Sequence, residues 1–253
     1  LAQNQLHLVY QPQVDYRDHS IVGVEALLRW QHPQHGFVAP DLFIPLAEQN
    51  GTIIPIGEWI LDQSCRQLRE WHDQGFSNLR MAINLSTVQL HHAELPRVVN
   101  NLMQVYRLPP KSLELEVTES LLLEATDDTR HQLSRLKSLG LSLAMDDFGT
   151  GYSSLSYLKK FPIDVIKIDR SFIKDIPGNQ DDMEITSAVI AMAHNLKLKV
   201  VAEGIETGAQ LGFLRRHKCD IGQGYLFDRP IPGRELIDGL RRYPCRPQAD
   251  QRT

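Results

Sequence analysis

Two adjacent acids followed by a glycine-rich loop are the residues of this sequence best suited to chemistry. Asp146 and Asp147 follow the apolar run 141–145, and the loop sequence FGTGY at 148–152 comes directly after them. Ser153 then has the residue type of a helix N-cap. Because a buried carboxylate is costly without a cation or donors beside it, this stretch permits two interpretations. It is either a solvated strand end with a glycine turn or part of a functional site.

The composition is that of a globular domain without a general nucleic-acid surface. The chain has 253 residues, of which 42% are hydrophobic and 23% charged, and its formal net charge is −4. Since no block of Lys and Arg is present, we exclude polymeric nucleic acid as a partner. No apolar run has the length of a membrane span. Three widely spaced cysteines fit neither a disulfide framework nor a zinc knuckle and favour a reducing cytoplasm.

The two ends of the sequence indicate a domain of a longer protein. The chain begins at Leu1 instead of Met, and residues 1–6 resemble the end of a helix that starts earlier. Residues 244–253 are polar and contain Pro and Gln, which is typical of a flexible extension. We therefore expect one domain over 1–243 and a flexible tail over 244–253. The sequence leaves open whether the parent protein is anchored in the inner membrane.

Hydrophobic periodicity predicts eight strands, and the last seven of them are each followed by a helix. The expected strands are 7–12, 21–28, 79–85, 113–117, 141–145, 165–168, 199–202 and 221–225, and the expected helices are 41–49, 56–74, 96–106, 129–139, 153–159, 183–196, 208–216 and 233–240. The link between the first two strands is too short for a parallel crossover. We therefore predict an α/β fold, a TIM-like (β/α)8 barrel variant with an antiparallel first strand. The alternative, an open doubly wound sheet, lacks a glycine-rich dinucleotide fingerprint.

Polar residues stand at or near the C-terminal ends of seven successive expected strands. They are Glu25, Asn84, Glu116, Glu119, Asp146, Asp147, Lys167, Asp169, Glu203, Glu206 and Gln223. In a barrel these ends meet on one face, where barrel enzymes carry out their chemistry. A single acid at a strand end is usually a cap or a solvated group, but a series over seven strands favours one shared site.

The shared site has the donor set of a metal centre. Like charges this close do not stay ionised without a cation, so we expect bound metal. The candidate ligands are Glu25, Asn84, Glu116 and Asp146, with Asp147 bridging to a second ion. Because all of these are oxygen donors and no His or Cys joins them, the site favours Mg²⁺ or Mn²⁺ over Zn²⁺. Two such ions suit in-line displacement at phosphorus. Ca²⁺ should inhibit, because its longer bonds and looser geometry misplace the attacking water.

Lys167 lies among these acids and has two possible roles. A partly desolvated lysine near cations has a lowered pKa, so it would orient or deprotonate a water molecule. Otherwise it would form an ion pair with Asp146 or Glu203.

The ordered motifs of the chain resemble those of the EAL-domain family of cyclic di-GMP phosphodiesterases. They are YQP at 10–12, EALLRW at 25–30 followed by HP at 32–33, NLS at 84–86, EVTE at 116–119, DDFGTG at 146–151, KID at 167–169, AEGIE at 202–206 and QGYL at 223–226. The similarity runs in order and without a gap from about residue 7 to about residue 240.

The resemblance implies a barrel with an antiparallel first strand and Mg²⁺- or Mn²⁺-dependent hydrolysis of one phosphodiester bond of cyclic di-GMP to linear pGpG. The positions that match the family's metal ligands are Glu25, Asn84, Glu116 and Asp146, and Asp147 matches the ligand of the second metal. Lys167 takes the water-activating position. The shell around metal and water is completed by Glu203 and Gln223. Gln11, Leu27, Arg29, Asp169 and Glu206 fall where the family contacts its ligand. Glu119 matches the glutamate that holds the loop after the fifth strand. Arg29 also suits a phosphate clamp by its own chemistry, since a guanidinium binds phosphate oxygens bidentately.

Two other functions are left open. A non-catalytic cyclic di-GMP receptor or scaffold would bind the dinucleotide without cleaving it. An unrelated metal-dependent barrel hydrolase would require the ordered motifs to be coincidental. The complete set of acids favours the enzyme, because unpaired buried charges would only destabilise the domain. The resemblance further implies a homodimer and an upstream sensor or diguanylate cyclase domain.

Overall fold

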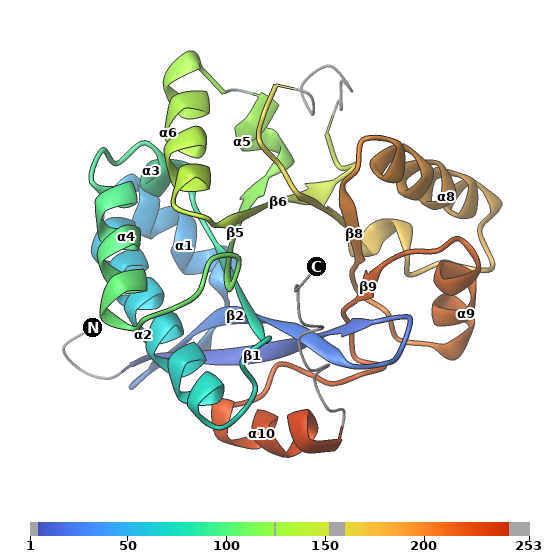
Figure 1. Ribbon diagram of the computed structural model, residues 1–253, viewed down its shortest axis with the longest axis horizontal. Helices are drawn as coiled ribbons and strands as arrows, with labels where there is room; N and C mark the ends of the chain where they lie inside the picture. The colour runs from blue at the N-terminus through green and yellow to red at the C-terminus, as the bar shows by residue number, and fades with distance from the viewer. Residues whose placement is uncertain (1–4, 124, 152–159, 243–253) are drawn as a thin grey trace, which may run out of the picture.

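A closed barrel forms the centre of the computed structural model, which describes residues 5–123, 125–151 and 160–242 (Figure 1). Within these ranges the barrel strands are β1 (Leu6–Asp15), β2 (Ile21–His32), β4 (Arg80–Asn84), β5 (Leu113–Thr118), β6 (Ser142–Phe148), β7 (Val165–Ile168), β8 (Lys199–Ala202) and β9 (Ile221–Gly222). From β2 through β4 to β9 all neighbours pair in parallel, whereas β1 is antiparallel to both β2 and β9 and closes the barrel. The predicted barrel variant is therefore confirmed.

Helices surround the barrel and cover its outer face (Figure 1). They are α1 (Pro40–Gln49), α2 (Ile53–Asp73), α3 (Thr87–Leu90), α4 (Leu95–Val105), α5 (Glu119–Leu123), α6 (Asp127–Ser138), η1 (Arg170–Phe172), α8 (Gln180–Asn195), α9 (Gly208–Arg216) and α10 (Gly233–Arg242). Seven of the expected helices are confirmed with small shifts at their ends. The eighth, 153–159 with Ser153 as its cap, and the tail 244–253 lie outside the described residues. Sequence analysis missed α3, α5 and η1, which are too short to show a helical period.

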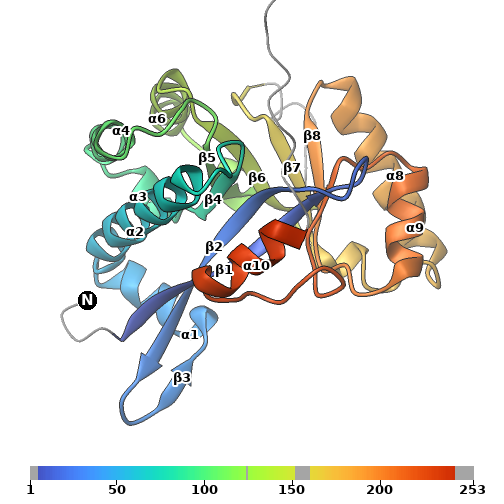
Figure 2. The same ribbon diagram turned by 60° about the horizontal axis from the view of Figure 1, so that its bottom comes forward.

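Two strand boundaries differ from the expected ones. The second strand was expected over 21–28, but β2 continues to His32 and pairs with the short strand β3 (Gly36–Val38). Figure 2 shows this hairpin projecting from the barrel. Pairing of β1 with β2 as far as Leu6 and Trp30 satisfies the backbone of the extension. The last strand is shorter than expected, so Gln223 follows β9 instead of lying in it.

The inner surface of the barrel has an apolar layer and a polar layer. Ala144, Val165, Val201 and Ile221 form a small buried cluster separate from the main core. The main core includes the alternate residues Leu143, Ile166 and Val200 together with helical residues, so those face outward. Two positions after the members of the inner cluster come Asp146, Lys167, Glu203 and Gln223. The strand period thus places a polar layer directly above the apolar one, towards the carboxyl ends of the strands.

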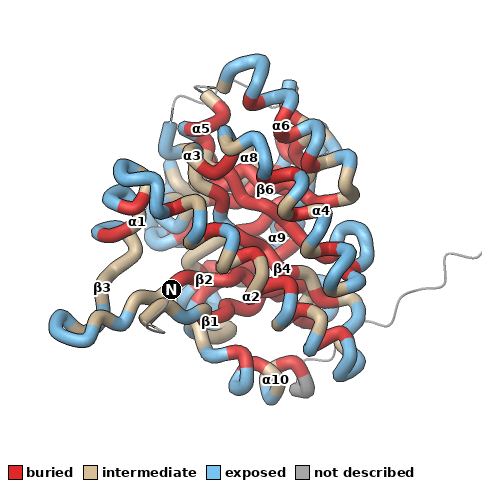
Figure 3. The backbone as a smooth tube through the Cα atoms, turned by 90° about the vertical axis from the view of Figure 1, so that its left-hand side faces the viewer, coloured by how far each residue is buried: buried red, intermediate tan, exposed pale blue. Residues whose placement is uncertain are grey.

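The outer face packs against amphipathic helices, whose solvent sides are exposed (Figure 3). Leu61, Leu68 and Trp71 of α2 are fully or almost fully buried, and the Trp71 ring packs edge-on against Tyr10 of β1 at 5.0 Å. The helix predicted over 56–74 therefore packs on the barrel through a buried apolar face. Within the described part of the chain, no helix is both long and apolar enough to cross a membrane.

Gly224 offers a test of how tightly the end of the barrel is packed. A Cβ at this position would lie 2.2 Å from the backbone N and O of Ile205, between the segments that carry Gln223 and Glu203. We expect Gly224→Ala to lower the free energy of unfolding by about 3 kcal/mol, the upper end of the usual cost of overpacking. Chemical denaturation would measure this.

Gly239 provides the matched control, because a Cβ there meets nothing within 4 Å and its residue lies in α10. Gly239→Ala should be neutral or stabilise by up to about 1 kcal/mol through helix propensity. Equal stability of Gly224→Ala and the unmodified chain would contradict the packing described here.

Candidate active site

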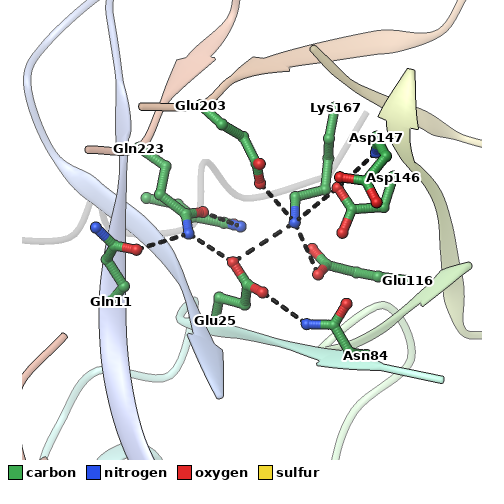
Figure 4. Close-up of polar contacts among 10 residues, drawn as sticks. Gln11, Glu25, Asn84, Glu116, Asp146, Asp147, Lys167, Glu203 and Gln223 are labelled. Carbon is green, nitrogen blue, oxygen red and sulfur yellow. Dashed lines mark hydrogen bonds and ion pairs between the residues drawn. The ribbon is translucent and has the colours of Figure 1, made fainter. Parts of the chain in front are cut away.

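A buried ammonium group lies at the centre of the polar layer. The Lys167 side chain is 1% exposed, and its Nζ lies 2.7 Å from Glu203 Oε1 and 2.8 Å from Glu116 Oε2. Asp146 Oδ1 is 3.3 Å away and Glu25 Oε2 is 3.5 Å away. Figure 4 shows the four carboxylates converging on the lysine from different strands. The free-energy cost of removing these charges from water is offset by their mutual pairing. Loss of one charge should therefore destabilise the whole cluster.

The pKa of Lys167 differs from the sequence-based expectation. Burial lowers its pKa, but the negative charges of Asp146, Glu116, Glu203 and Glu25 outweigh burial and hold the pKa well above its ordinary value. The expectation of a lowered pKa concerned a lysine beside bound cations; among the described protein groups, the four acids raise the pKa instead. The alternative expectation, an ion pair with Asp146 or Glu203, is confirmed for both acids. Lys167 is itself a cation that offsets the gathered acids.

Glu25 is held by amide groups as well as by the lysine. Asn84 Nδ2 donates to Glu25 Oε1 at 2.7 Å, and Gln223 Nε2 donates to Glu25 Oε2 at 2.5 Å and to Gln11 Oε1 at 3.1 Å. Burial raises the pKa of Glu25, but the charge of Lys167 and these hydrogen bonds lower it below its ordinary value. Glu25 is therefore ionised at neutral pH, with both oxygens directed by donors.

Glu116 and Glu203 are in the opposite electrostatic situation. Burial and the charge of Glu25 raise the pKa of Glu116 well above its ordinary value, and Lys167 offsets this only in part. Burial likewise raises the pKa of Glu203 to about 8, although Lys167 opposes the shift. Glu116 Oε1 is buried and has no hydrogen-bond partner among the described residues. This oxygen is therefore free to accept an additional electropositive group.

A break in strand regularity brings Asp146 and Asp147 together. The pairing of β6 with β7 shifts register between Met145 and Phe148, and Asp147 has a left-handed φ of 55°. In a regular strand consecutive side chains point to opposite faces, whereas an irregularity of this kind redirects them. Figure 4 shows both acids at the same edge of the cluster. Burial, followed by the charge of Asp146, raises the pKa of Asp147.

Glu119 contacts the glycine-rich loop, as its motif position had led us to expect. Its side chain is buried, and Oε2 accepts a hydrogen bond from Gly149 N at 2.8 Å. Gly149 has a φ of 101°, a conformation that favours glycine. A Cβ on Gly151 would lie 3.1 Å from Glu119 Oε1, so both glycines allow close approach to the carboxylate.

A cavity of about 260 Å³ opens beside the cluster. Among the residues predicted to contact a ligand, Gln11, Leu27, Glu206 and Gln223 line it. Two lining residues, Arg170 and Tyr225, were missed by sequence analysis. In the sequence, only their place beside known motifs could have indicated a role in the site: Arg170 follows the KID motif, and Tyr225 belongs to QGYL. The cavity therefore has a guanidinium and an aromatic ring besides its acids.

Arg29 and Asp169 lie outside the residues that line this cavity. Arg29 Nη1 donates to Leu28 O at 2.9 Å, and burial lowers the pKa of Arg29 against the opposing charges of Tyr225 and Glu25. Asp169 caps η1 by accepting a hydrogen bond from Ser171 N at 3.0 Å. Its observed contact therefore positions the segment that begins with Arg170.

Gln13 is a further member of the network that the sequence did not reveal. Its Nε2 donates to Gln223 Oε1 at 3.1 Å, which orients the amide that in turn holds Glu25. The available signal was its spacing of two residues from Gln11 on β1, since both then face the barrel interior.

The donor set fits a hard divalent cation. Glu25, Asn84, Glu116 and Asp146 offer only oxygen ligands, and one buried Glu116 oxygen lacks a partner. Within the described ranges, no three His, Cys, Asp or Glu side chains already have the mutual arrangement of a metal site. A cation bound by these carboxylates would require loss of protons from those whose pKa is raised.

Together, the fold and the site define a (β/α) barrel protein with an acid–lysine cluster at the carboxyl ends of its strands. Residues 1–230 match the family model described as the EAL domain. Cyclic di-GMP phosphodiesterase NbdA of Pseudomonas aeruginosa is 50% identical over 243 residues, which cover 96% of this chain and 31% of that protein. The bifunctional diguanylate cyclase/cyclic di-GMP phosphodiesterase MucR of the same species is 48% identical and is covered to 35%.

A solved structure of the PaMucR phosphodiesterase in complex with c-di-GMP superposes with a TM-score of 0.89 at 48% identity, covering 93% of this chain and 95% of that one. The chain belongs to the EAL-domain family. It spans about a third of the length of the two curated relatives, which are 31% and 35% covered.

Removal of the central ammonium group tests whether the cluster depends on it. We expect Lys167→Met to lower the free energy of unfolding at pH 7 by about 3 to 5 kcal/mol, because four carboxylates lose a buried cation. Since the folded-state pKa of Lys167 is raised, its contribution is present throughout the neutral range. The loss should shrink towards pH 4.5, where the carboxylates left without the lysine become protonated. Denaturant unfolding at both pH values measures this.

The exposed Lys174 provides the control, because among the described residues its ammonium pairs only with Asp175, at 3.8 Å. Lys174→Met should change stability by less than about 0.5 kcal/mol. A loss in Lys167→Met no larger than in this control would show that the cluster is not a stabilising unit.

Proposed function

We propose that this chain is a phosphodiesterase domain that hydrolyses one phosphodiester bond of cyclic di-GMP and releases linear pGpG. The observation that carries the proposal is the cluster of Glu25, Glu116, Asp146 and Glu203 around Lys167 at the edge of a cavity. It combines strong oxygen ligands with a buried donor at the face where barrel enzymes act. The names of NbdA and of the PaMucR structure support cyclic di-GMP as the substrate.

We assign the metal-ligand roles to the oxygen donors of the cluster. Phosphodiesterases of this family are typically metal-dependent. Glu25, Asn84, Glu116 and Asp146 would hold one Mg²⁺ or Mn²⁺, and Asp147 would contribute to a second. When bound, such ions make water more acidic and stabilise negative charge on the transferred phosphoryl group. The unpartnered oxygen of Glu116 supports its place in this set.

The remaining polar groups orient water and substrate. The Lys167 ammonium is a hydrogen-bond donor and the Glu203 carboxylate is an acceptor. The two groups are 2.7 Å apart, and Glu203 lines the cavity, so both can contact one water molecule there. This pair would align the attacking water for in-line displacement. Gln223 keeps Glu25 turned towards the cluster. Glu119 would hold the loop at Gly149 in its working shape.

Ligand recognition would use the walls of the cavity and its rim. Gln11, Leu27 and Glu206 line the cavity, and Arg170 provides a guanidinium suited to a phosphate. Arg29 retains the role of phosphate clamp, and Asp169 would act with η1 to position Arg170. The Tyr225 ring offers a surface on which a base can stack.

The wider setting of the domain is inferred from its length and its thiols. Because the two curated relatives are about three times longer, we infer upstream sensor or diguanylate cyclase domains in the full-length protein. The motif resemblance supports a homodimer and the boundaries 1–243. Buried free thiols at Cys65 and Cys219 support a reducing, cytoplasmic environment. Anchoring of the parent protein in the inner membrane depends on segments outside this chain.

Product analysis tests the proposed reaction. Incubation with cyclic di-GMP and Mg²⁺ or Mn²⁺ should produce linear pGpG, separated by chromatography. Glu25→Ala should reduce kcat by at least about a hundredfold, because even residues behind a metal ligand contribute about 10- to 100-fold. Glu235→Ala, an exposed acid of α10, should retain the full rate. Tight binding of cyclic di-GMP without any product would instead establish the receptor function.

Replacement of the metal tests the geometry of the site. Added Ca²⁺ should suppress turnover supported by Mg²⁺, because its longer and less directional bonds leave the water out of line with the phosphate. Initial rates at fixed Mg²⁺ and increasing Ca²⁺ measure the effect, and equilibrium binding of cyclic di-GMP in Ca²⁺ provides the comparison. Equal rates with the two ions would contradict the proposed arrangement.

A further inference from the structure

The opposite mouth of the barrel, at the amino ends of its parallel strands, holds a basic cavity of about 520 Å³. Six cationic side chains line it, Arg17, Arg80, Lys111, Lys137, Lys197 and Lys199, together with three acids, Asp15, Asp164 and Asp220. The lining therefore has an excess of three positive charges, although the whole chain has a formal net charge of −4. Such a concentration of charge in a concave site focuses the local field on anions.

The three acids of the cavity are already engaged. Asp15 Oδ2 is paired with Arg17 Nη2 at 2.5 Å, and Asp164 is paired with Lys137. Asp220 Oδ2 accepts from Val200 N at 2.9 Å and lies 3.0 Å from His194 Nε2. Asp15 and Asp164 are thus paired with cations of the lining itself, whereas Asp220 is held by an N–H group and a histidine and its charge also acts on Lys199.

Three lysines remain without an acidic partner. Lys111, Lys197 and Lys199 form no ion pair with any residue in the described ranges. The nearby Arg80 lies 3.8 Å from Glu114 and donates from Nε to Val22 O at 3.5 Å. Burial lowers the pKa of Lys199, and the charge of Arg80 lowers it further, while Asp220 and Glu114 oppose the shift only in part. The negative charge of a bound anion would counter both effects. Lys197, which follows α8, also balances the negative end of that helix, but Lys199 begins a strand and has no such role.

The floor of the cavity is apolar. Its apolar lining residues are Val22, Leu141, Ile163, Val165 and Ile221. The side chains of Ser142 and Asn78 add hydrogen-bonding groups. Its volume falls within the range of about 300 to 1,000 Å³ typical of small-molecule sites. The cavity is separate from the acid cluster, because the inner apolar layer of Ala144, Val165, Val201 and Ile221 lies between them.

We propose that this mouth is a binding site for a small anion that carries several phosphate groups. Lys111, Lys197 and Lys199 bind the phosphate oxygens, Arg80 adds a guanidinium that can bind two oxygens, and the apolar floor receives an organic part where the molecule has one. The site does not depend on the proposed hydrolysis, since it uses none of the residues assigned to that reaction.

Calorimetric titration with inorganic triphosphate, in buffer with a metal chelator, tests the proposal. We expect saturable binding of one triphosphate per chain. The double variant Lys111→Gln, Lys199→Gln should bind at least about tenfold more weakly, since each charge-assisted contact contributes about 1.5 to 3 kcal/mol and 1.4 kcal/mol is tenfold. Replacing both lysines by arginine should retain affinity, which separates lost charge from lost fold.

Two controls locate the anion. Lys174→Gln, an exposed lysine outside the cavity, and Arg29→Gln, at the opposite face, should leave the affinity unchanged. A titration with GTP distinguishes a nucleotide from bare polyphosphate, because tighter binding than triphosphate shows that the apolar floor contributes. Absence of saturable binding, equal weakening in Lys174→Gln, or loss of binding in Arg29→Gln would each overturn the proposal.

Discussion

The ion cluster around Lys167 is the interaction on which the rest of this structure depends. One fully buried ammonium group lies within 3.5 Å of carboxylates from the β2, β5, β6 and β8 segments. Each of these charges is costly to bury alone, so the register of every strand that carries one is constrained by the others. The antiparallel closure through β1 is part of the same constraint, because it sets Gln11 opposite Glu25 and brings Gln223 within reach of both.

The alternation of the strands explains how one barrel presents two chemically different ends. Outward residues such as Leu143 and Ile166 join the core beneath the helices, while inward residues form an apolar layer and then a polar one. The polar layer opens towards the carboxyl ends of the strands as an acidic cavity. At the amino ends the apolar layer faces a cavity with an excess of basic groups. The net charge of the chain is only −4, although the two cavities at the ends of its barrel carry charge of opposite sign.

The pKa of Lys167 shows where reasoning from strand ends was insufficient. A partly desolvated lysine near cations was expected to have a lowered pKa, whereas the charged groups nearest to Lys167 in the fold are four acids, which raise its pKa. The sign of such a shift depends on distances of a few ångströms between residues far apart in sequence. The same limit explains why the missed residues Gln13, Arg170 and Tyr225 had only their motif positions as a signal.

The sequence by itself determined the fold class, the order of the barrel strands and the acids that gather around Lys167. These follow from the period of the strands, which is a local property, and from polar residues repeated near successive strand ends. The tertiary structure alone decided that β2 runs on to His32 and that an irregularity at Asp146 and Asp147 brings both acids to one edge. It also decided that a basic cavity forms at the far mouth, because charge balance and strand register depend on neighbours that only the closed barrel brings together.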